Sequence, residues 1–230
     1  MHPNLNFTSK SYEEVAESIS TDPEYKCLLE SLQKIQLLDK VDLKDSGSND
    51  DLDNFQIFTP EFIVRDMIDA VGKDKVTDSA NRILEPTSGD GAFTVRILQM
   101  RLAKIKERDR DSLIRGVFES LGTVYSIEMD ENLVKAQRNN IYTTAIKFLK
   151  RKKIELTESE DLVLRLMINE NVIWGETNSD PKAIFSEIDC EMAHYMPCED
   201  KNNKIPVEFP VWSFLERSVN LHYELPELGD

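Results

Sequence analysis

The sequence lacks the features that mark membrane-spanning and secreted proteins. No stretch of its 230 residues approaches the ~18 uninterrupted apolar residues that a spanning helix needs. The first residues do not have the basic-then-apolar order of a signal peptide. Three cysteines, Cys27, Cys190 and Cys198, do not make a disulfide framework. We therefore expect a folded protein of a reducing, cytoplasmic compartment, without a membrane partner.

Basic residues are also scarce. The chain has 28 Lys and Arg against 43 Asp and Glu, for a formal charge of −15. Residues 1–60 hold 12 acids and 5 bases, and residues 181–230 hold 10 acids and 4 bases, so both flanks are acidic. Nucleic acid is a polyanion, and its binders usually carry a basic face. The chain alone is therefore a poor candidate for non-specific DNA binding, and we interpret the flanks as solvated surface.

The chain divides at a polar stretch rich in Gly, Ser and Asp, residues 44–54, which is typical of a linker. Before it, residues 11–40 carry apolar side chains at helical spacing, which indicates one or two amphipathic helices. We therefore predict an N-terminal helical arm with its linker over residues 1–54, and a second unit over residues 55–230.

The second unit alternates between helical and strand-like patterns. The pattern predicts helices at 57–72, 92–107, 131–153 and 157–170, and strands at 81–86, 123–130 and 171–175. Thr59 is the expected N-cap of the first helix, and Gly72 its end. Strand–helix–strand alternation requires crossovers, so it predicts an α/β fold with a parallel, Rossmann-like sheet. Beyond residue 175 the pattern weakens, with a possible helix at 182–196 and a strand-like piece at 204–208.

The turn after the first strand, EPTSGDGAF, combines two glycines with two acids. Gly89 and Gly91 let a ligand approach the backbone, and exposed N–H groups at the following helix favour a negative group. Glu85 and Asp90, in contrast, would repel a phosphate and hold an ammonium group. An amino acid moiety has both charges, and S-adenosylmethionine carries such a moiety together with a sulfonium cation. The G-x-G-x-x-G dinucleotide fingerprint is absent.

Polar side chains also follow the second and third strands. Glu128 ends the second strand, where a carboxylate can accept both ribose hydroxyls of a nucleoside. Its neighbour Met129 is apolar and could pack on an adenine face, and Glu176 after the third strand could accept from an adenine amino group. In open α/β sheets, ligands bind at the carboxyl ends of the strands. The three strand ends therefore predict a site for one nucleoside–amino-acid ligand.

Together, these motifs resemble those of the amino-terminal half of the adenine-N6 DNA methyltransferases. QIFTPEFIV is similar to the family's F-x-T-P motif, and EPTSGDGAF to its acidic-Pro-x-x-G-x-G-x-Phe cofactor loop. SIEMDE resembles the ribose-binding strand end, and NVIWGET the third motif. The resemblance covers about residues 55–178. The helical arm ahead of the T-P motif is most like the modification subunits of type I and related restriction-modification systems.

The resemblance implies a class I methyltransferase fold with S-adenosylmethionine as cofactor. It implies cofactor-binding roles for Phe58, Thr59, Pro60, Glu85, Thr87, Gly89, Gly91, Phe93, Glu128, Met129 and Glu176. In an active member, the flipped adenine nitrogen would attack the cofactor methyl group in line, so the work of the protein is mostly positioning.

The catalytic tetrapeptide of that family, Asn/Asp-Pro-Pro-aromatic, is absent from this chain. The nearest stretches are NSDP at 178–181 and FPVW at 209–212. In the second, Phe209 stands where an acceptor side chain would be needed, and Phe209, Val211 and Trp212 are interpreted as core residues. No catalytic residue is therefore assigned. We therefore expect the chain to be a fragment, a degenerate homologue, or a compact variant whose partner completes the site.

Several functions remain open at this point. The first is a DNA methyltransferase that reaches DNA only with a partner subunit. The second is a non-catalytic cofactor-binding or scaffold subunit, and the third is methylation of a substrate other than nucleic acid. Cys190, His194 and Cys198 would share one face of a helix, but three ligands do not complete a structural zinc site and Pro197 disturbs that helix. No metal is expected.

Overall fold

The structure is a computed structural model that describes residues 11–44, 58–177, 193–197, 205–207 and 212. Its helices and strands in chain order are α1 (Tyr12–Thr21), the 3-10 helix η1 (Pro23–Tyr25), α2 (Lys26–Gln33), α3 (Glu61–Val71), α4 (Lys73–Thr77), β1 (Ile83–Glu85), α5 (Ala92–Lys104), α6 (Arg110–Leu121), β2 (Val124–Glu128), α7 (Glu131–Arg151), α8 (Glu158–Asn171), β3 (Val172–Thr177), β4 (Ala193–Pro197) and β5 (Ile205–Val207). None of the described helices is long and apolar enough to cross a membrane.

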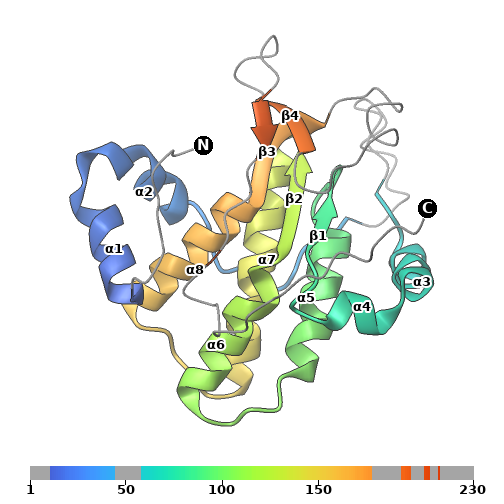
Figure 1. Ribbon diagram of the computed structural model, residues 1–230, viewed down its shortest axis with the longest axis horizontal. Helices are drawn as coiled ribbons and strands as arrows, with labels where there is room; N and C mark the ends of the chain where they lie inside the picture. The colour runs from blue at the N-terminus through green and yellow to red at the C-terminus, as the bar shows by residue number, and fades with distance from the viewer. Residues whose placement is uncertain (1–10, 45–57, 178–192, 198–204, 208–211, 213–230) are drawn as a thin grey trace, which may run out of the picture.

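The strands β1, β2 and β3 form a parallel sheet, as predicted, with helices between them in the sequence (Figure 1). In their register, Glu85 of β1 lies opposite Ser126 of β2, and Ser126 lies opposite Val172 of β3. All three strands therefore run in one direction, and the carboxyl ends of β1 and β2 lie side by side. This confirms the α/β class with an N-terminal helical arm.

The sheet continues in antiparallel fashion after β3. β4 pairs with β3 from Gly175 to Thr177, and β5 pairs with β4. The strand expected at 204–208 is confirmed as β5, whereas the helix expected at 182–196 is wrong where the structure describes it. Residues 193–196 belong to β4, because pairing with strands on both sides outweighs a local helical pattern.

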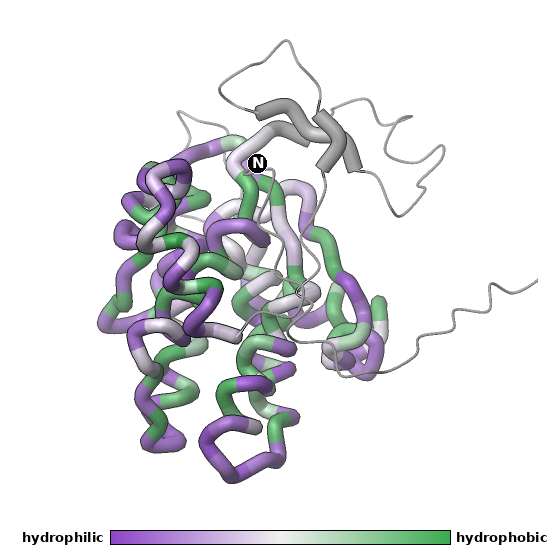
Figure 2. The backbone as a smooth tube through the Cα atoms, turned by 60° about the vertical axis from the view of Figure 1, so that its left-hand side comes forward, coloured by the Kyte–Doolittle hydropathy of each residue, from purple (hydrophilic) through white to green (hydrophobic). Residues whose placement is uncertain are grey.

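The helices α6, α7 and α8 begin at polar side chains that accept hydrogen bonds from the first turn, whereas α5 begins after Gly91 without a side-chain cap. Asp130 accepts from the N–H groups of Asn132 and Leu133 at the start of α7, and Thr157 forms a capping box with Glu160 at the start of α8. In Figure 2, hydrophilic and hydrophobic colours alternate along the helical turns, which is typical of helices with one buried face. Helix α6 was not predicted.

The boundaries of α3 differ by one residue from the sequence prediction. Pro60, with ψ of 147°, is the residue before the helix, and no side chain caps its first turn, so Thr59 is not the N-cap. Gly72 ends the helix with a φ of 106°, as predicted. Val64 and Ile68 of α3 pack in a second hydrophobic cluster with residues of α4, α5 and β2.

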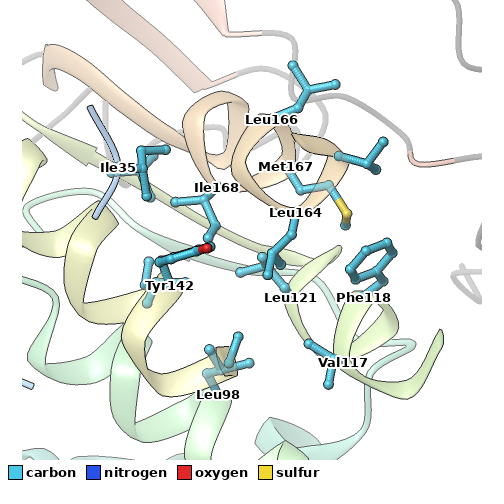
Figure 3. Close-up of a cluster of buried hydrophobic side chains, with 14 of the residues drawn as sticks. Ile35, Leu98, Val117, Phe118, Leu121, Tyr142, Leu164, Leu166, Met167 and Ile168 are labelled. Carbon is cyan, nitrogen blue, oxygen red and sulfur yellow. The ribbon is translucent and has the colours of Figure 1, made fainter. Parts of the chain in front are cut away.

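The main hydrophobic core joins the N-terminal arm to the α/β unit. Leu28 and Leu32 of α2 are buried in one cluster with side chains of α5, α6, α7 and α8. Figure 3 shows part of this cluster, with Leu98, Phe118, Tyr142 and Leu164 from those four helices. The ring of Tyr12 meets that of Phe118 edge-on, with centroids 5.1 Å apart. Figure 1 shows α1 and α2 beside α8 at one side of the molecule, and α3 and α4 beside α5 at the other.

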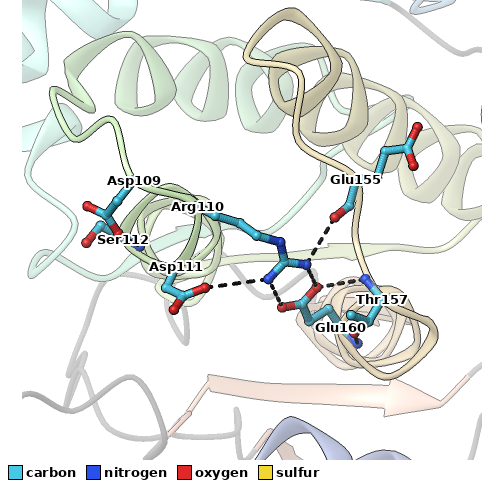
Figure 4. Close-up of polar contacts among 7 residues, drawn as sticks. All are labelled: Asp109, Arg110, Asp111, Ser112, Glu155, Thr157 and Glu160. Carbon is cyan, nitrogen blue, oxygen red and sulfur yellow. Dashed lines mark hydrogen bonds and ion pairs between the residues drawn. The ribbon is translucent and has the colours of Figure 1, made fainter.

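A bidentate ion pair links α6 to α8 (Figure 4). Arg110 donates through Nη1 and Nη2 to Glu160, over 2.9 and 2.6 Å, and its Nη2 also donates to the carbonyl of Glu155 at 3.1 Å. Glu160 is buried and also accepts from the Thr157 N–H at 2.7 Å. The carboxylate that completes the capping box therefore also fixes the α7–α8 connection against the start of α6.

The 35–44 segment, which follows α2, lies along α7. The N–H of Gln36 donates to Asn139 Oδ1 at 2.8 Å. Asp42 and Asn140 exchange two hydrogen bonds, over 2.9 and 3.0 Å, through the Asp42 backbone and the Asn140 amide. These hydrogen bonds hold the 35–44 segment against α7, and the end of the segment reaches the loop that follows β1.

Candidate functional site

The loop between β1 and α5, residues 86–91, is held by hydrogen bonds from its own N–H groups. Ser88 donates to the carbonyl of Ile127 at 3.1 Å, and Gly91 donates to the carbonyl of Ser88 at 2.9 Å. Gly89 donates to Glu128 Oε2 at 2.7 Å. The protein itself therefore supplies the acceptors of these three loop N–H groups, and the expectation that the N–H groups of the following helix favour a negative group stays a prediction.

The two loop glycines are required for different reasons. Gly89 has a φ of 57° and nothing within 4 Å of where a Cβ would lie. Gly91 has a φ of 90°, and a Cβ there would lie 2.6 Å from Gln137 Cγ. Gly89 is therefore needed only for its backbone conformation, whereas Gly91 is also needed for the close approach of α7.

Carboxylates from both strands and the loop meet at this edge. Glu85 at the end of β1 is partly buried, and Asp90 and Glu128 are buried. Burial raises the pKa of Glu85 to about 8, and the nearby charges of Asp90 and Glu128 add to that rise. Thr94 opposes it by donating its hydroxyl to Glu85 Oε2 at 2.7 Å. The structure thus brings Glu85, Gly89 and Glu128 to one place.

Glu128 ties the ends of two loops together. Its Oε2 accepts from Gly89, and its Oε1 accepts from the N–H of Asp130 at 2.9 Å. Each carboxylate oxygen can accept a second hydrogen bond, so a ligand hydroxyl can still bind. The adjacent Met129 is 64% exposed, and its carbonyl accepts from Trp174 Nε1 at 3.1 Å. An apolar surface therefore lies next to the acceptor.

Gln137 of α7 connects the loop, α5 and β2, and the sequence interpretation missed it. Its Oε1 accepts from the Ser88 hydroxyl at 2.7 Å. Its Nε2 donates to Thr94 Oγ1 at 3.1 Å and to Ser126 Oγ at 2.9 Å. Gln137 is fully buried, yet a glutamine within a helix has no local signal that distinguishes it from a surface residue.

Asp90 holds the 35–44 segment to the loop. Its Oδ2 accepts from the N–H of Lys44 at 2.6 Å, and its carbonyl accepts from the Asn140 amide at 3.2 Å. Burial raises the pKa of Asp90, and the Lys44 N–H acts in the opposite direction. The Asp90 side chain thus binds the protein backbone through one oxygen, and its role toward a ligand ammonium group stays a prediction.

Other predicted cofactor residues lie around this loop in different environments. Phe58 is buried, and the Lys44 ammonium lies 4.9 Å from its ring centroid. Thr59 and Pro60 are partly buried, and Thr87 is exposed. The Lys44 contact places the start of the T-P motif beside the segment that reaches the glycine loop.

Of two further predicted residues, one packs in the second hydrophobic cluster and the side chain of the other is not described. Phe93 is partly buried and packs against the second hydrophobic cluster, which includes Val64 and Ile68. Glu176 was expected after the third strand, but it lies within β3, because antiparallel pairing with β4 extends that strand to Thr177. The side chain of Glu176 lies outside the described part of the chain.

The stretches compared with the missing tetrapeptide fall mostly outside the described residues. This holds for 178–181 and for Phe209 and Val211. Trp212 is 3% exposed and donates from Nε1 to Asn171 Oδ1 at 3.0 Å, which confirms it as a core residue. His194 lies in β4, whereas Cys190 and Cys198 are not described. Among the described residues, no group of His, Cys, Asp and Glu could hold a metal ion.

Replacing Glu85 with glutamine is expected to stabilise the protein only at high pH. The folded state keeps the Glu85 proton up to about pH 8, whereas the ordinary pKa is 4.5. The stability that this proton provides is fully present below pH 4.5 and is lost as the pH rises through 8. Glu85→Gln should therefore match the wild type at pH 4 and exceed it at pH 9, by at most about 5 kcal/mol. Urea unfolding at both pH values measures this, with the exposed Glu158→Gln as control; equal effects at pH 4 and 9 would contradict it.

No family model, curated protein or solved structure matches this chain. The function is therefore argued from the geometry of the loop and its carboxylates.

Proposed function

We propose that this chain binds S-adenosylmethionine at the carboxyl ends of β1 and β2, as a methyltransferase-like protein related to the N6-adenine DNA methylases of restriction-modification systems. One observation carries the proposal. The carboxyl groups of Glu85 and Glu128 lie at one edge of the sheet, beside a glycine loop in which the Ser88, Gly89 and Gly91 N–H groups are already bonded. Two neighbouring acids, with these three N–H donors already used within the protein, favour a cationic ligand over a phosphate.

Each part of such a ligand has a counterpart here. The ammonium group would lie near Glu85, the ribose hydroxyls would donate to Glu128, and the adenine would pack on the exposed Met129. The F-x-T-P motif, with Phe58 beside Lys44, would lie over the methionine end. These assignments follow the motif order, and the compartment proposed for the protein is the cytoplasm.

A second candidate is a non-catalytic cofactor-binding or scaffold subunit. Two observations favour it: the chain has no Asn-Pro-Pro-aromatic sequence, and its formal charge is −15. Trp212, the aromatic residue of the nearest sequence, is buried and bonded to Asn171, so it is not available to stack on a base. In this role the chain would meet DNA only through a partner subunit that supplies the base-binding residues.

Calorimetric titration with S-adenosylmethionine tests what both candidates share. We expect wild-type binding that weakens at least tenfold in Glu128→Gln, because one carboxylate charge and two ribose acceptors are altered. Glu158→Gln changes the charge equally at an exposed site on α8 and should bind like the wild type. No binding at millimolar ligand would reject both candidates. Transfer of a labelled methyl group to DNA then separates an enzyme from a scaffold, with and without neighbouring gene products.

A further inference from the structure

The Glu85 carboxyl group is held by a side chain that has no counterpart among the predicted site residues. Thr94 lies in the first turn of α5, is 1% exposed, and donates its hydroxyl to Glu85 Oε2 at 2.7 Å. It is the one side chain whose described hydrogen bond fixes that carboxyl group. The backbone N–H of Thr94 also bonds to Glu85, so the orientation of Glu85 depends on the Thr94 hydroxyl and N–H together.

Gln137 sets the direction of that hydroxyl. The Gln137 Nε2 donates to Thr94 Oγ1 at 3.1 Å and to Ser126 Oγ at 2.9 Å, so both of its N–H bonds are used. An amide nitrogen cannot accept a hydrogen bond, so Thr94 cannot donate back to it. The Thr94 proton is therefore left for Glu85, and the donors run in order from Gln137 through Thr94 to Glu85.

We propose that Thr94 is a positioning residue of the ligand site: oriented by Gln137, its hydroxyl holds the Glu85 carboxyl group in the direction in which it can accept a hydrogen bond from a ligand ammonium group. The inference rests on the proposed function for the identity of the ligand. The hydrogen bond from Thr94 to Glu85 is present whatever the ligand is.

The hydrogen bond from Thr94 acts against the negative charges that surround Glu85. Asp90 faces it from the loop and Glu128 from the end of β2, and both disfavour a further negative charge. Lys44 of the 35–44 segment is the cation beside Asp90. A hydrogen bond from a hydroxyl stabilises a carboxylate more than a carboxylic acid. Thr94 therefore lowers the pKa of Glu85, whereas Asp90 and Glu128 raise it.

Two substitutions separate a positioning role from a packing role. Thr94→Val keeps the shape of the side chain and removes the hydroxyl, whereas Thr94→Ser keeps the hydroxyl. The titration midpoint of Glu85 is measured by carbon-detected NMR of the full chain, assigned with Glu85→Gln. Binding of S-adenosylmethionine is measured by calorimetry at pH 7.

We expect Thr94→Val to move the Glu85 midpoint upward by about one pH unit and to weaken binding roughly tenfold. Thr94→Ser should restore the affinity to within about threefold of the wild-type value, and the Glu85 midpoint to within about half a pH unit. A loss of packing alone would lower stability without moving the midpoint. Equal midpoints in the wild type and Thr94→Val would overturn the proposal.

A second variant covers the case in which Thr94→Val does not fold. Gln137→Met removes the donor that orients Thr94, and the Glu85 midpoint should move in the same direction, to a smaller extent; an unchanged midpoint there would count equally against the proposal. If wild-type protein does not bind S-adenosylmethionine, the proposed function fails, while the midpoints alone still decide whether Thr94 controls Glu85.

Discussion

Gly91→Ala is expected to destabilise the protein by roughly 3 kcal/mol and to weaken ligand binding at least tenfold. A Cβ at this position would lie 2.6 Å from Gln137 Cγ. Gln137 is fully buried, and its amide oxygen and nitrogen are both hydrogen-bonded, so it has little room to move. The φ of 90° adds strain for any residue with a side chain. The loop must therefore shift, and it carries the Gly89 N–H that binds Glu128. Thermal unfolding and calorimetric titration measure the two effects.

Gly89→Ala is the matched control for this substitution. Its φ of 57° lies in the left-handed region too, but no atom lies within 4 Å of the added methyl group. We expect a loss of only about 1 kcal/mol, from the backbone conformation alone. Similar losses at both positions would show that contact with Gln137 does not limit the loop.

Arg101→Met is expected to lower the free energy of unfolding by roughly 3–5 kcal/mol, or about 10 °C in the midpoint. Arg101 is 2% exposed on α5. Its guanidinium donates to the carbonyls of Val76, Ser120, Asp78 and Asn81 and to the hydroxyl of Thr123, over 2.8–3.1 Å. Burial lowers the pKa of Arg101 to about 10, so the group stays charged at neutral pH. Methionine would leave these acceptors unbonded in the interior.

The position of Arg101 separates stability from ligand binding. Asn81 precedes β1 and Thr123 precedes β2, so the guanidinium holds the amino ends of the strands, opposite the glycine loop. Ligand affinity of the folded fraction should therefore not change. Arg96→Met is the control on the same helix, because no described residue forms a hydrogen bond or ion pair with Arg96. A loss in Arg96→Met equal to that in Arg101→Met would exclude the bonded acceptors as the cause.

The elements that could be predicted from the sequence are those with strong local signals. Thr157 and Glu160 mark the start of α8 by their spacing, and Gly72 marks the end of α3 by its conformation. The glycine loop was placed correctly because few turns combine its residues with a preceding strand. Helix α6 has such signals as well, with an Asp109 cap and buried Leu113, Val117 and Leu121 at helical spacing, and could have been found.

The contacts that complete the site could not be predicted, because they join segments far apart in the chain. The bond from the Lys44 N–H to Asp90, for example, joins residues 46 positions apart. Thr94 and Gln137 look like ordinary helix residues, and only the packing of α5 on α7 buries them. Likewise, the strand β4 follows from pairing with β3, which no local pattern contains.

The docking of the N-terminal arm has a consequence for synthesis on the ribosome. The helices α1 and α2 pack against α8, which begins at residue 158, and the 35–44 segment binds side chains of α7. At about 5–20 residues per second, the first helices to emerge wait on the order of 10 s for those partners. During that interval the apolar side chains of Leu28 and Leu32 have no core to enter, so the nascent arm depends on its own polar residues or on a chaperone to remain unaggregated.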